Sequence, residues 1–498
     1  MGGGLMQLVA YGAQDIYLTG NPQITFFKVV YRRHTNFSME AIEQTFNGSI
    51  TKAGSKVTST ISRNGDLITR MWLDIVLHMG TGKNAVMFTN DVGHALLEEC
   101  ELEIGGQLID RHDSFFSNIY SHLFDWGSGA TTGLQNSDQY RNTSRLEFAG
   151  AAGARAGTIV NTQLYIPLNF WFCRNPGLAL PLIALQYHEV KFKLKTRAID
   201  SLLVFDGKAP GQFTPNPDGT LDPTVKLFAD YIYLDTDERR RFAQVSHEYL
   251  IEQVQSTTHK YEHTIDLNLN HPVKYLAWVI QHNRVFEDPG IAGVAKDRKV
   301  GNNQSYVEGN VAEPADFTST GLVNQGTEVC KGDYFCYNWL AGKLIDRVQV
   351  QGGTAPQGSH IEYLPGSDIG DPLLHGFQTM SLSLNGHERF APRKPGYFKF
   401  CQKLQHDVNP SSDPYVDDIR TDIYDNIYMY SFALKPREHQ PSGTCNFSRI
   451  DSAQMKFTIQ TPVTTPDFGF NNQTLRVYAV NYNVLRIMSG MGGLAYSN

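Results

Sequence analysis

Four short segments in the first half of this 498-residue chain resemble four segments of the second half, in the same order along the chain. The four pairs are 66–76 with 272–282, 102–111 with 382–391, 187–196 with 452–461 and 229–235 with 480–486. The first pair aligns Trp72 with Trp278. An ordered internal repeat constrains the architecture of the whole chain. The sequence therefore predicts two copies of one fold, joined near residues 237–255.

The repeated unit has the pattern of β-strands separated by tight turns. Val57, Ser59 and Ile61 share one face of an alternating run, which breaks at Asn64-Gly65 before the next strand begins. A second strand ends at the glycine pair of LEIGGQ, where a hairpin turn is expected. Short strands with turn residues between them are typical of sandwiches and barrels.

Helical spacing is scarce, and the segment 114–126 is its best case. Jelly rolls protect the exposed edges of antiparallel sheets by stacking two sheets. We therefore expect an all-β protein of two tandem eight-stranded jelly-roll sandwiches, with long loops and few short helices. The predicted domains are 25–240 and 241–498, preceded by an N-terminal segment, 1–24.

The composition is that of a folded globular protein, with 41% hydrophobic and 19% charged residues. No run of about 18 uncharged apolar residues occurs, so a membrane-spanning helix is not expected. The net charge of −7 argues against a protein that coats nucleic acid, because phosphate binding depends on clustered Lys and Arg. The six cysteines are scattered, which indicates free thiols in a reducing compartment.

Each motif that could carry catalysis or bind a metal lacks a required residue. GTGKN (80–84) resembles a phosphate-binding loop without its first glycine and its Ser/Thr. HEYLIEQ (247–253) lacks the second histidine of a zinc-protease helix. DTDERR (235–240) lacks the glycine of a calcium loop. The sequence therefore predicts no enzyme activity, no cofactor and no metal site.

The stretch YLTGNPQITFFKVVYRR (17–33) places apolar and cationic side chains ahead of the first alternating pattern, near residue 55. Asn21 and Pro22 suit the start of a helix, and the apolar spacing favours one short amphipathic helix. Three turns are marginal alone in water, so the segment needs a surface to lie against. Two interpretations stay open: a helix packed on its own domain, or an assembly arm for a neighbouring subunit. The arm's predicted contact residues are Phe26, Phe27, Lys28, Val30, Arg32 and Arg33.

Several Asn-x-Ser/Thr triplets are present, and such triplets can accept glycans only on the secretory route. The candidates for glycosylation are Asn303, in the long polar loop at roughly 284–340, and Asn446.

Long stretches of the sequence are similar to the major capsid proteins of nucleocytoplasmic large DNA viruses, a double jelly-roll family. They include LVAYGAQDIYLTGNPQITFFKVVYRRHTNF, ISRNGDLI, IGGQLIDRH, YIPLNFWFCRNPGLALPLIALQYHEVKF and ADYIYLDTDERRRFAQ. The resemblance runs from residue 8 to about residue 255 and recurs near NGHERF and the C-terminal strand. The loops at 127–160, 205–222 and 284–340 show none.

The resemblance implies a structural protein that forms homotrimers, whose six jelly rolls make a pseudo-hexagonal capsomer of an icosahedral shell. It implies contacts with neighbouring capsomers and with penton and minor capsid proteins. It implies no direct contact with nucleic acid and only indirect contact with an inner membrane. The protein would belong to the virion and assemble in the host cytoplasm. The alternative is a lectin-like jelly roll that binds carbohydrate, since this fold also hosts sugar sites.

Overall fold

The computed structural model describes most of the chain outside several loops and the N-terminal segment. The described residues are 21, 22, 27, 29, 31–79, 81–82, 86–88, 92–124, 160–205, 213–214, 222–282, 326–328, 335, 337, 344–346, 376–408, 426–458 and 473–496.

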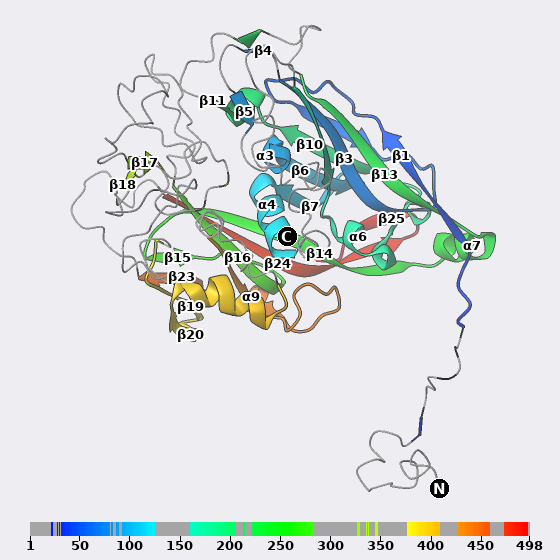
Figure 1. Ribbon diagram of the computed structural model, residues 1–498. Coiled ribbons are helices and arrows are strands. Elements are labelled where there is room, and N and C mark those ends of the chain that lie inside the picture. The colour runs from blue at the N-terminus through cyan, green and yellow to red at the C-terminus, as the bar shows by residue number, and fades with distance from the viewer. Residues whose placement is uncertain are drawn as a thin grey trace, which may run out of the picture.

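The first half of the chain forms two antiparallel sheets that face each other (Figure 1). Sheet 1 has the order β1 (Phe37–Gln44), β13 (Thr224–Leu234), β3 (Leu67–Met79), β8 (Val160–Pro167), with β9 (Leu180–Pro181) also paired to β3. Sheet 2 has the order β2 (Lys56–Thr60), β10 (Val190–Thr196), β6 (Leu97–Ile104), β7 (Gln107–Asp113).

The second half repeats this arrangement strand for strand. Sheet 3 has the order β14 (His247–Lys260), β24 (Gln473–Met488), β16 (Pro272–His282), β21 (Ile427–Ser431), with β22 (Cys445–Asn446) on β16 and β25 (Met491–Leu494) on β24. Sheet 4 has the order β15 (Thr264–Asp266), β23 (Ala453–Thr458), β19 (Thr379–Leu384), β20 (His387–Arg393). The prediction of two eight-stranded jelly rolls is confirmed, and we call them the first and second roll.

The remaining described elements are short. The helices are α3 (Val92–Leu96), α4 (Ser114–Phe124), α6 (Trp171–Arg174), α7 (Thr236–Gln244) and α9 (Gln402–Gln405), with short 3-10 or π turns η3 (Pro176–Leu178), η4 (Leu182–Ala184), η5 (Ile199–Leu202), η8 (Tyr397–Cys401) and η9 (Phe447–Arg449). Three two-stranded ribbons pair β5 (Val86–Phe88) with β11 (Leu203–Phe205), β4 (Thr81–Gly82) with β12 (Phe213–Thr214), and β17 (Gly326–Glu328) with β18 (Leu344–Asp346). The best case of helical spacing in the sequence, 114–126, is therefore present as α4.

Each of the four sequence repeats falls on a pair of strands that hold the same place in the two rolls: β3 and β16, the β6–β7 and β19–β20 hairpins, β10 and β23, and β13 and β24. The two hairpins match residue by residue from the turn as far as the pairs Leu102–Asp110 and Leu382–Phe390. Their turns have positive φ at Gly105-Gly106 and at Asn385-Gly386, as a two-residue hairpin turn requires. The repeat of sequence at the hairpin therefore reflects turn geometry.

The alignment of Trp72 with Trp278 is wrong at the level of single residues. Trp278 is fully buried inside the second roll, whereas Trp72 lies half-buried on the outside of the first, stacked on Phe228 at 5.7 Å between ring centroids. Both β3 and β16 contain an irregularity in their pairing with the next strand. A slip of one residue turns a side chain to the opposite face of a sheet, so the strands correspond but these tryptophans do not.

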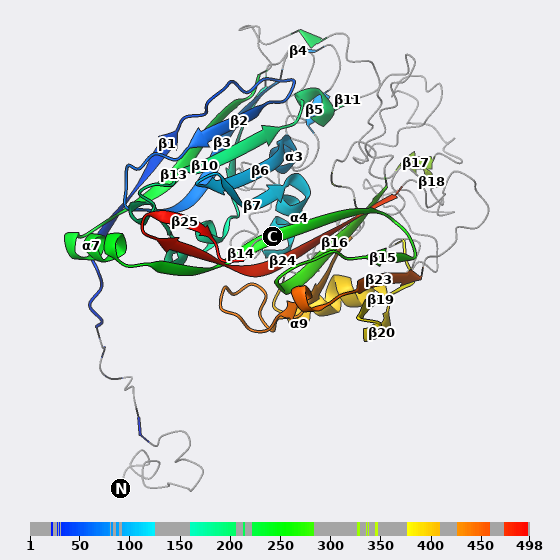
Figure 2. The ribbon, with the colours of Figure 1, turned by 180° about the vertical axis from the view of Figure 1, so that it is seen from behind.

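Sheet 3 is buried on both faces, which explains the continuous apolar run YLAWVI in β16. Tyr275, Ala277 and Val279 belong to a core shared with the first roll. Leu276, Trp278 and Ile280 belong to the second roll's own core. Alternate residues of a strand point to opposite faces, so the run is apolar throughout. The two rolls are thus joined through one packed interior, with α4 between them in Figure 2.

The expected helix near the N-terminus is wrong for its described residues. Residues 29 and 31–36 form no helix, and Asn21 has φ of 52°, which no helix N-cap adopts. The first strand also begins earlier than predicted, at Phe37 in place of about residue 55. A short amphipathic helix is stable only when its apolar face is buried, and the described side chains here are exposed.

Candidate assembly surfaces

The N-terminal segment leads away from the body of the molecule beside α7, as residues 31–36 show in Figure 1. Of the predicted arm residues, Phe27 is 97% exposed, and Arg32 and Arg33 are exposed as well. The other three, Phe26, Lys28 and Val30, lie outside the described residues. The described arm residues make a cationic and apolar surface that this chain does not bury.

The described apolar side chains of this segment are exposed. They are Phe27, Val29 and Tyr31, followed in β1 by Phe37 and Met39, which are 57% and 51% exposed.

β1 continues this segment onto the outer face of sheet 1. Across the sheet, Glu43 lies opposite Phe228, Phe228 opposite Trp72, and Trp72 opposite Pro167. These side chains point away from the sandwich core and are half-buried or exposed, as are Asp74, Tyr165, Asp230, Phe37 and Met39. Ile232, opposite Met39, is buried in a small cluster with Leu67 and Ala179. We call this surface the outer face of sheet 1.

The corresponding face of sheet 3 is covered by the first roll. The Tyr478 hydroxyl donates to Asp113 Oδ2 at 2.8 Å, and its ring lies 5.9 Å from that of Phe116 in α4. The rings of Phe124 and Tyr275 are 5.4 Å apart. We call this contact of β7, α4 and α6 with sheet 3 the inter-roll joint. The same side of a jelly roll is thus buried in one roll and open in the other.

A buried cluster of charges crosses the inter-roll joint. Glu252 of β14 accepts from Arg174 Nη1 of α6 at 2.7 Å and from Lys274 Nζ of β16 at 2.6 Å, and His439 Nδ1 lies 3.4 Å away. Burial would raise the pKa of Glu252, but the His439 hydrogen bond and the charges of Arg174 and Lys274 outweigh it and lower that pKa to about 2. The carboxylate therefore stays ionised between the rolls.

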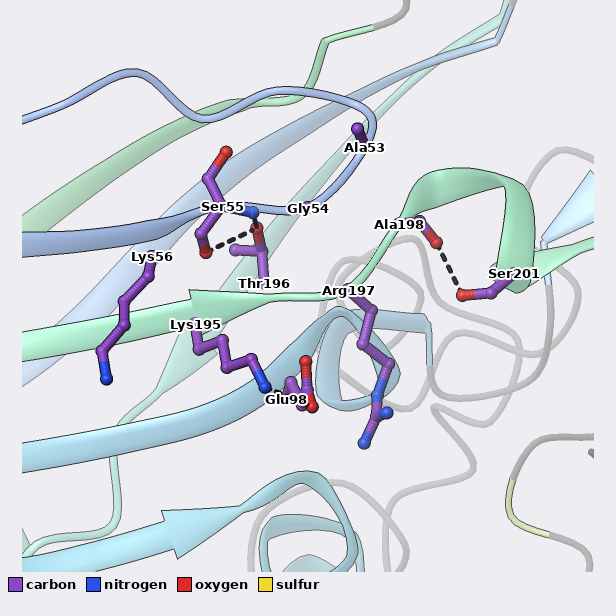
Figure 3. A pocket seen from close by; sticks show the side chains of 10 residues that line it. All are labelled: Ala53, Gly54, Ser55, Lys56, Glu98, Lys195, Thr196, Arg197, Ala198 and Ser201. Atoms are coloured by element: carbon purple, nitrogen blue, oxygen red, sulfur yellow. Dashed lines mark hydrogen bonds and ion pairs between the residues drawn. The ribbon is translucent and has the colours of Figure 1, made fainter.

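A shallow depression of about 530 Å³ lies where β2 begins and β10 ends (Figure 3). Lys195 Nζ pairs with Glu98 Oε1 at 2.8 Å, and the Ser55 amide donates to Thr196 Oγ1 at 3.0 Å. Its lining contains no histidine or cysteine and only one carboxylate. It offers no paired acid and base and no activated nucleophile, so it gives no basis for catalysis.

Within the described part of the chain, no group of three or more His, Cys, Asp or Glu side chains could hold a metal ion. Cys100, Cys173, Cys401 and Cys445 are free thiols, and burial raises the pKa of Cys100 to about 12, which makes it unreactive. None of the described helices is long and apolar enough to cross a bilayer.

Of the two predicted glycosylation sites, Asn303 lies outside the described residues. Asn446 is exposed in β22, where its side-chain oxygen accepts from the Ser448 amide at 3.1 Å. Its side chain therefore already caps η9.

Two family models match almost the whole chain. The model described as the major capsid protein N-terminus matches residues 25–235, and the one described as the large eukaryotic DNA virus major capsid protein matches residues 238–493. The major capsid proteins of Pyramimonas orientalis virus and Phaeocystis pouchetii virus are 42% and 41% identical to this chain, and both alignments cover 100% of each protein. That of Paramecium bursaria Chlorella virus 1 is 38% identical over the same coverage.

Solved structures agree with the sequence relatives. The PBCV-1 virus capsid contains a chain with a TM-score of 0.62 and 36% identity, covering 95% of this chain and 100% of that chain. The Faustovirus major capsid protein, at 13% identity, shares the fold with a TM-score of 0.58 and coverage of 96% and 94%. These relatives are structural proteins and not enzymes, and none supports the lectin-like alternative. The chain belongs to the family of major capsid proteins of large eukaryotic DNA viruses.

Proposed function

We propose that the protein forms a homotrimer, in which six jelly rolls build a pseudo-hexagonal capsomer, and that capsomers tile an icosahedral shell. The observation that carries this proposal is the difference between two equivalent faces. The outer face of sheet 3 is buried in the inter-roll joint, and the outer face of sheet 1 is open. A contact that joins roll to roll in one direction can continue from chain to chain and close into a ring.

A native mass measurement tests the trimer. Purified protein at micromolar concentration is expected to have a mass near three times 55.8 kDa and to keep it on dilution, because assemblies of this kind bury more than about 2,000 Å² per contact. A stable, folded monomer under these conditions would contradict the proposal.

We also propose the division of the chain into an assembly arm, 1–24, and two domains, 25–240 and 241–498. The boundaries of the two family models, at residues 25, 235 and 238, support this division. The arm would contact neighbouring capsomers or components beneath the shell. The exposed Phe27, Arg32 and Arg33, which follow the arm, support a docking role for this end of the chain.

The partners proposed beyond the trimer are neighbouring capsomers and penton and minor capsid proteins, with assembly in the host cytoplasm. Contact with nucleic acid is not proposed, because the net charge is −7. Contact with an inner membrane would be indirect, through the minor proteins.

A further inference from the structure

Two lysines lie directly opposite each other where β2 begins and β10 ends. The antiparallel register pairs Lys56 of β2 with Lys195 of β10, whereas the other two lysines of β10 lie opposite threonines. Like charges directly across an antiparallel pair of strands destabilise the sheet. This end of the strand pair therefore concentrates positive charge, which the rest of the pair avoids.

Of these two lysines, Lys195 has a carboxylate partner. Its Nζ atom pairs with Glu98 Oε1 at 2.8 Å, and the other two lysines of β10 are ion-paired as well. Lys56 is exposed and makes no ion pair within the part of the chain that the structure describes. An anion from outside the chain can therefore neutralise Lys56 without displacing a carboxylate.

Arg197 adds a third cation, and hydrogen bonds fix its position. Its amide donates to the Leu96 carbonyl at 2.9 Å, and its Nη2 atom donates to Ser114 Oγ at 2.9 Å. Ser114 is fully buried at the start of α4, so it anchors the guanidinium. An anchored arginine loses little side-chain freedom on binding, and its planar set of N–H donors matches the geometry of an oxyanion.

The three cations line the shallow depression of about 530 Å³ described above (Figure 3). Backbone hydrogen bonds hold the loop before β2 against the end of β10: the Thr196 amide donates to the Ser55 carbonyl, and the Ile199 amide donates to the Lys52 carbonyl, both at 2.8 Å. Gly54 has φ of +86°, and a Cβ atom there would lie 2.8 Å from the Thr196 carbonyl oxygen, so glycine permits this close approach. The volume falls within the range of about 300–1,000 Å³ that is usual for ligand sites.

The depression is cationic within an acidic chain. Its lining has three cations, Lys56, Lys195 and Arg197, and one carboxylate, Glu98, whereas the whole chain has a net charge of −7. In Figure 3 the three cationic side chains extend in the same direction from the two strands. Lysine and arginine form their strongest hydrogen bonds with ionised oxygen groups such as phosphate, which accept several bonds at once.

We propose that this depression binds a phosphate or sulfate group, free or as an ester, with Lys56 and Arg197 as its principal donors and Lys195 beside them. The bound anion offsets the repulsion between Lys56 and Lys195 and so stabilises this end of the first roll. All of the binding residues belong to the first roll, so the site does not depend on the proposed trimer.

The site lies at the opposite end of the first roll from the N-terminal segment. The Lys52 amide, in the loop before β2, donates to Asp222 Oδ1 at 2.7 Å, close to Thr224, where β13 begins. β13 ends at Leu234, opposite Phe37, from which the N-terminal segment leads away. With the arm beneath the shell, as proposed, this end of the roll faces outward, where solutes of the medium can reach it.

Thermal unfolding of the full chain tests the proposal by comparing sodium phosphate with sodium chloride at equal ionic strength. Phosphate and sulfate stabilise most proteins by exclusion from their surfaces, so variants are needed to isolate binding. The unmodified protein is expected to show a saturable rise in melting temperature with phosphate. K56E is expected to lose this rise. K456E makes the same change of charge at an exposed lysine of β23, the strand equivalent to β10, and as the matched control should keep it.

Titration followed by phosphorus-31 NMR measures the binding directly. K56E is expected to weaken phosphate binding by at least roughly tenfold, and K456E should leave it unchanged. R197K keeps the charge but loses the planar donors, and it should also weaken binding. Inorganic phosphate and glucose 6-phosphate, titrated separately, distinguish the sources: tighter binding of the second identifies an ester as the ligand, and tighter binding of the first identifies the free anion.

The outcomes separate this inference from the proposed function. Lys56 is exposed, and K56E places a carboxylate opposite Lys195, so the variant is expected to fold, which circular dichroism checks. A folded, unmodified protein without saturable binding of phosphate or sulfate would overturn the proposal. An equal loss in K56E and K456E would also overturn it, because binding would then follow net charge and not this depression. A trimer that lacks the site contradicts this inference alone, and a monomer that has it contradicts the trimer alone.

Discussion

Glu252 holds a charge where the two rolls meet, and its partners come from three separate parts of the chain. Lys274 is only 1% exposed, so its ammonium depends on this carboxylate and on the Glu438 carbonyl, 2.8 Å away. Burying an ion pair costs desolvation, and the pair is stabilising only when its partners are complete. Removing one charged side chain of such a pair therefore lowers the free energy of unfolding by more than the pair itself contributes to it.

E252Q is expected to destabilise the protein by about 3–5 kcal/mol at neutral pH, because it leaves the buried Lys274 and the half-buried Arg174 without their counter-charge. The folded-state pKa of Glu252 is about 2, below the usual 4.5, so the wild-type advantage is complete above pH 4.5 and is lost as the pH falls toward 2. Urea unfolding of both proteins across this pH range measures it. E248Q, at an exposed surface pair with Arg486, is the control and should change stability little. An equal effect of both variants at pH 7 would contradict this account.

At the residue scale, the contacts of Glu252 could not be predicted from the sequence. Arg174 and Lys274 are 78 and 22 residues from Glu252, and no local pattern links them. The hairpin glycines were predictable, since Gly105 and Gly106 need positive φ. The environment of Trp72 was not, because one irregular residue in β3 reverses which face a side chain occupies.

At the element scale, strands with one buried face were predictable and strands with none were not. β2 buries Val57 and Ser59, and alternation reveals it. β1 is exposed along its first five residues, FSMEA, so the alternation of apolar and polar side chains there marks no buried face. The stretch before it was interpreted as a helix because Phe26, Phe27, Val29 and Val30 also fit helical spacing. Only tertiary context decides whether so short a segment forms a helix.

Deletion of residues 1–24 tests the arm as an element. The truncated chain is expected to fold and trimerise, with a melting temperature within about a few degrees of the full chain, since the sheets begin only at Phe37. Joining of trimers into shells should be impaired, as seen by electron microscopy of assembly reactions. Full-length protein assembled in parallel is the control. Failure of the truncated chain to fold would place this segment in the core instead.

At the scale of the whole molecule, the chain contains the same jelly roll twice, and the two rolls have the same strand order. The first roll contacts the second through β7 and α4, and the equivalent elements of the second roll are β20 and α9. The ordered repeats made the two rolls predictable from the sequence. The direction of their packing was not predictable, because it depends on which sheet face is covered, and both faces of sheet 3 are apolar.

A cryo-EM reconstruction of the assembled capsomer tests the central claim most directly, by comparing two rotations. One relates the first roll to the second within a chain, and the other relates the second roll to the first roll of the next chain. The account predicts that both are about 60°, since six equivalent rolls share one turn, and that the second roll of the next chain covers the outer face of sheet 1. A capsomer in which the outer face of sheet 1 is exposed to solvent, or packs against the same face of another chain, would contradict the account.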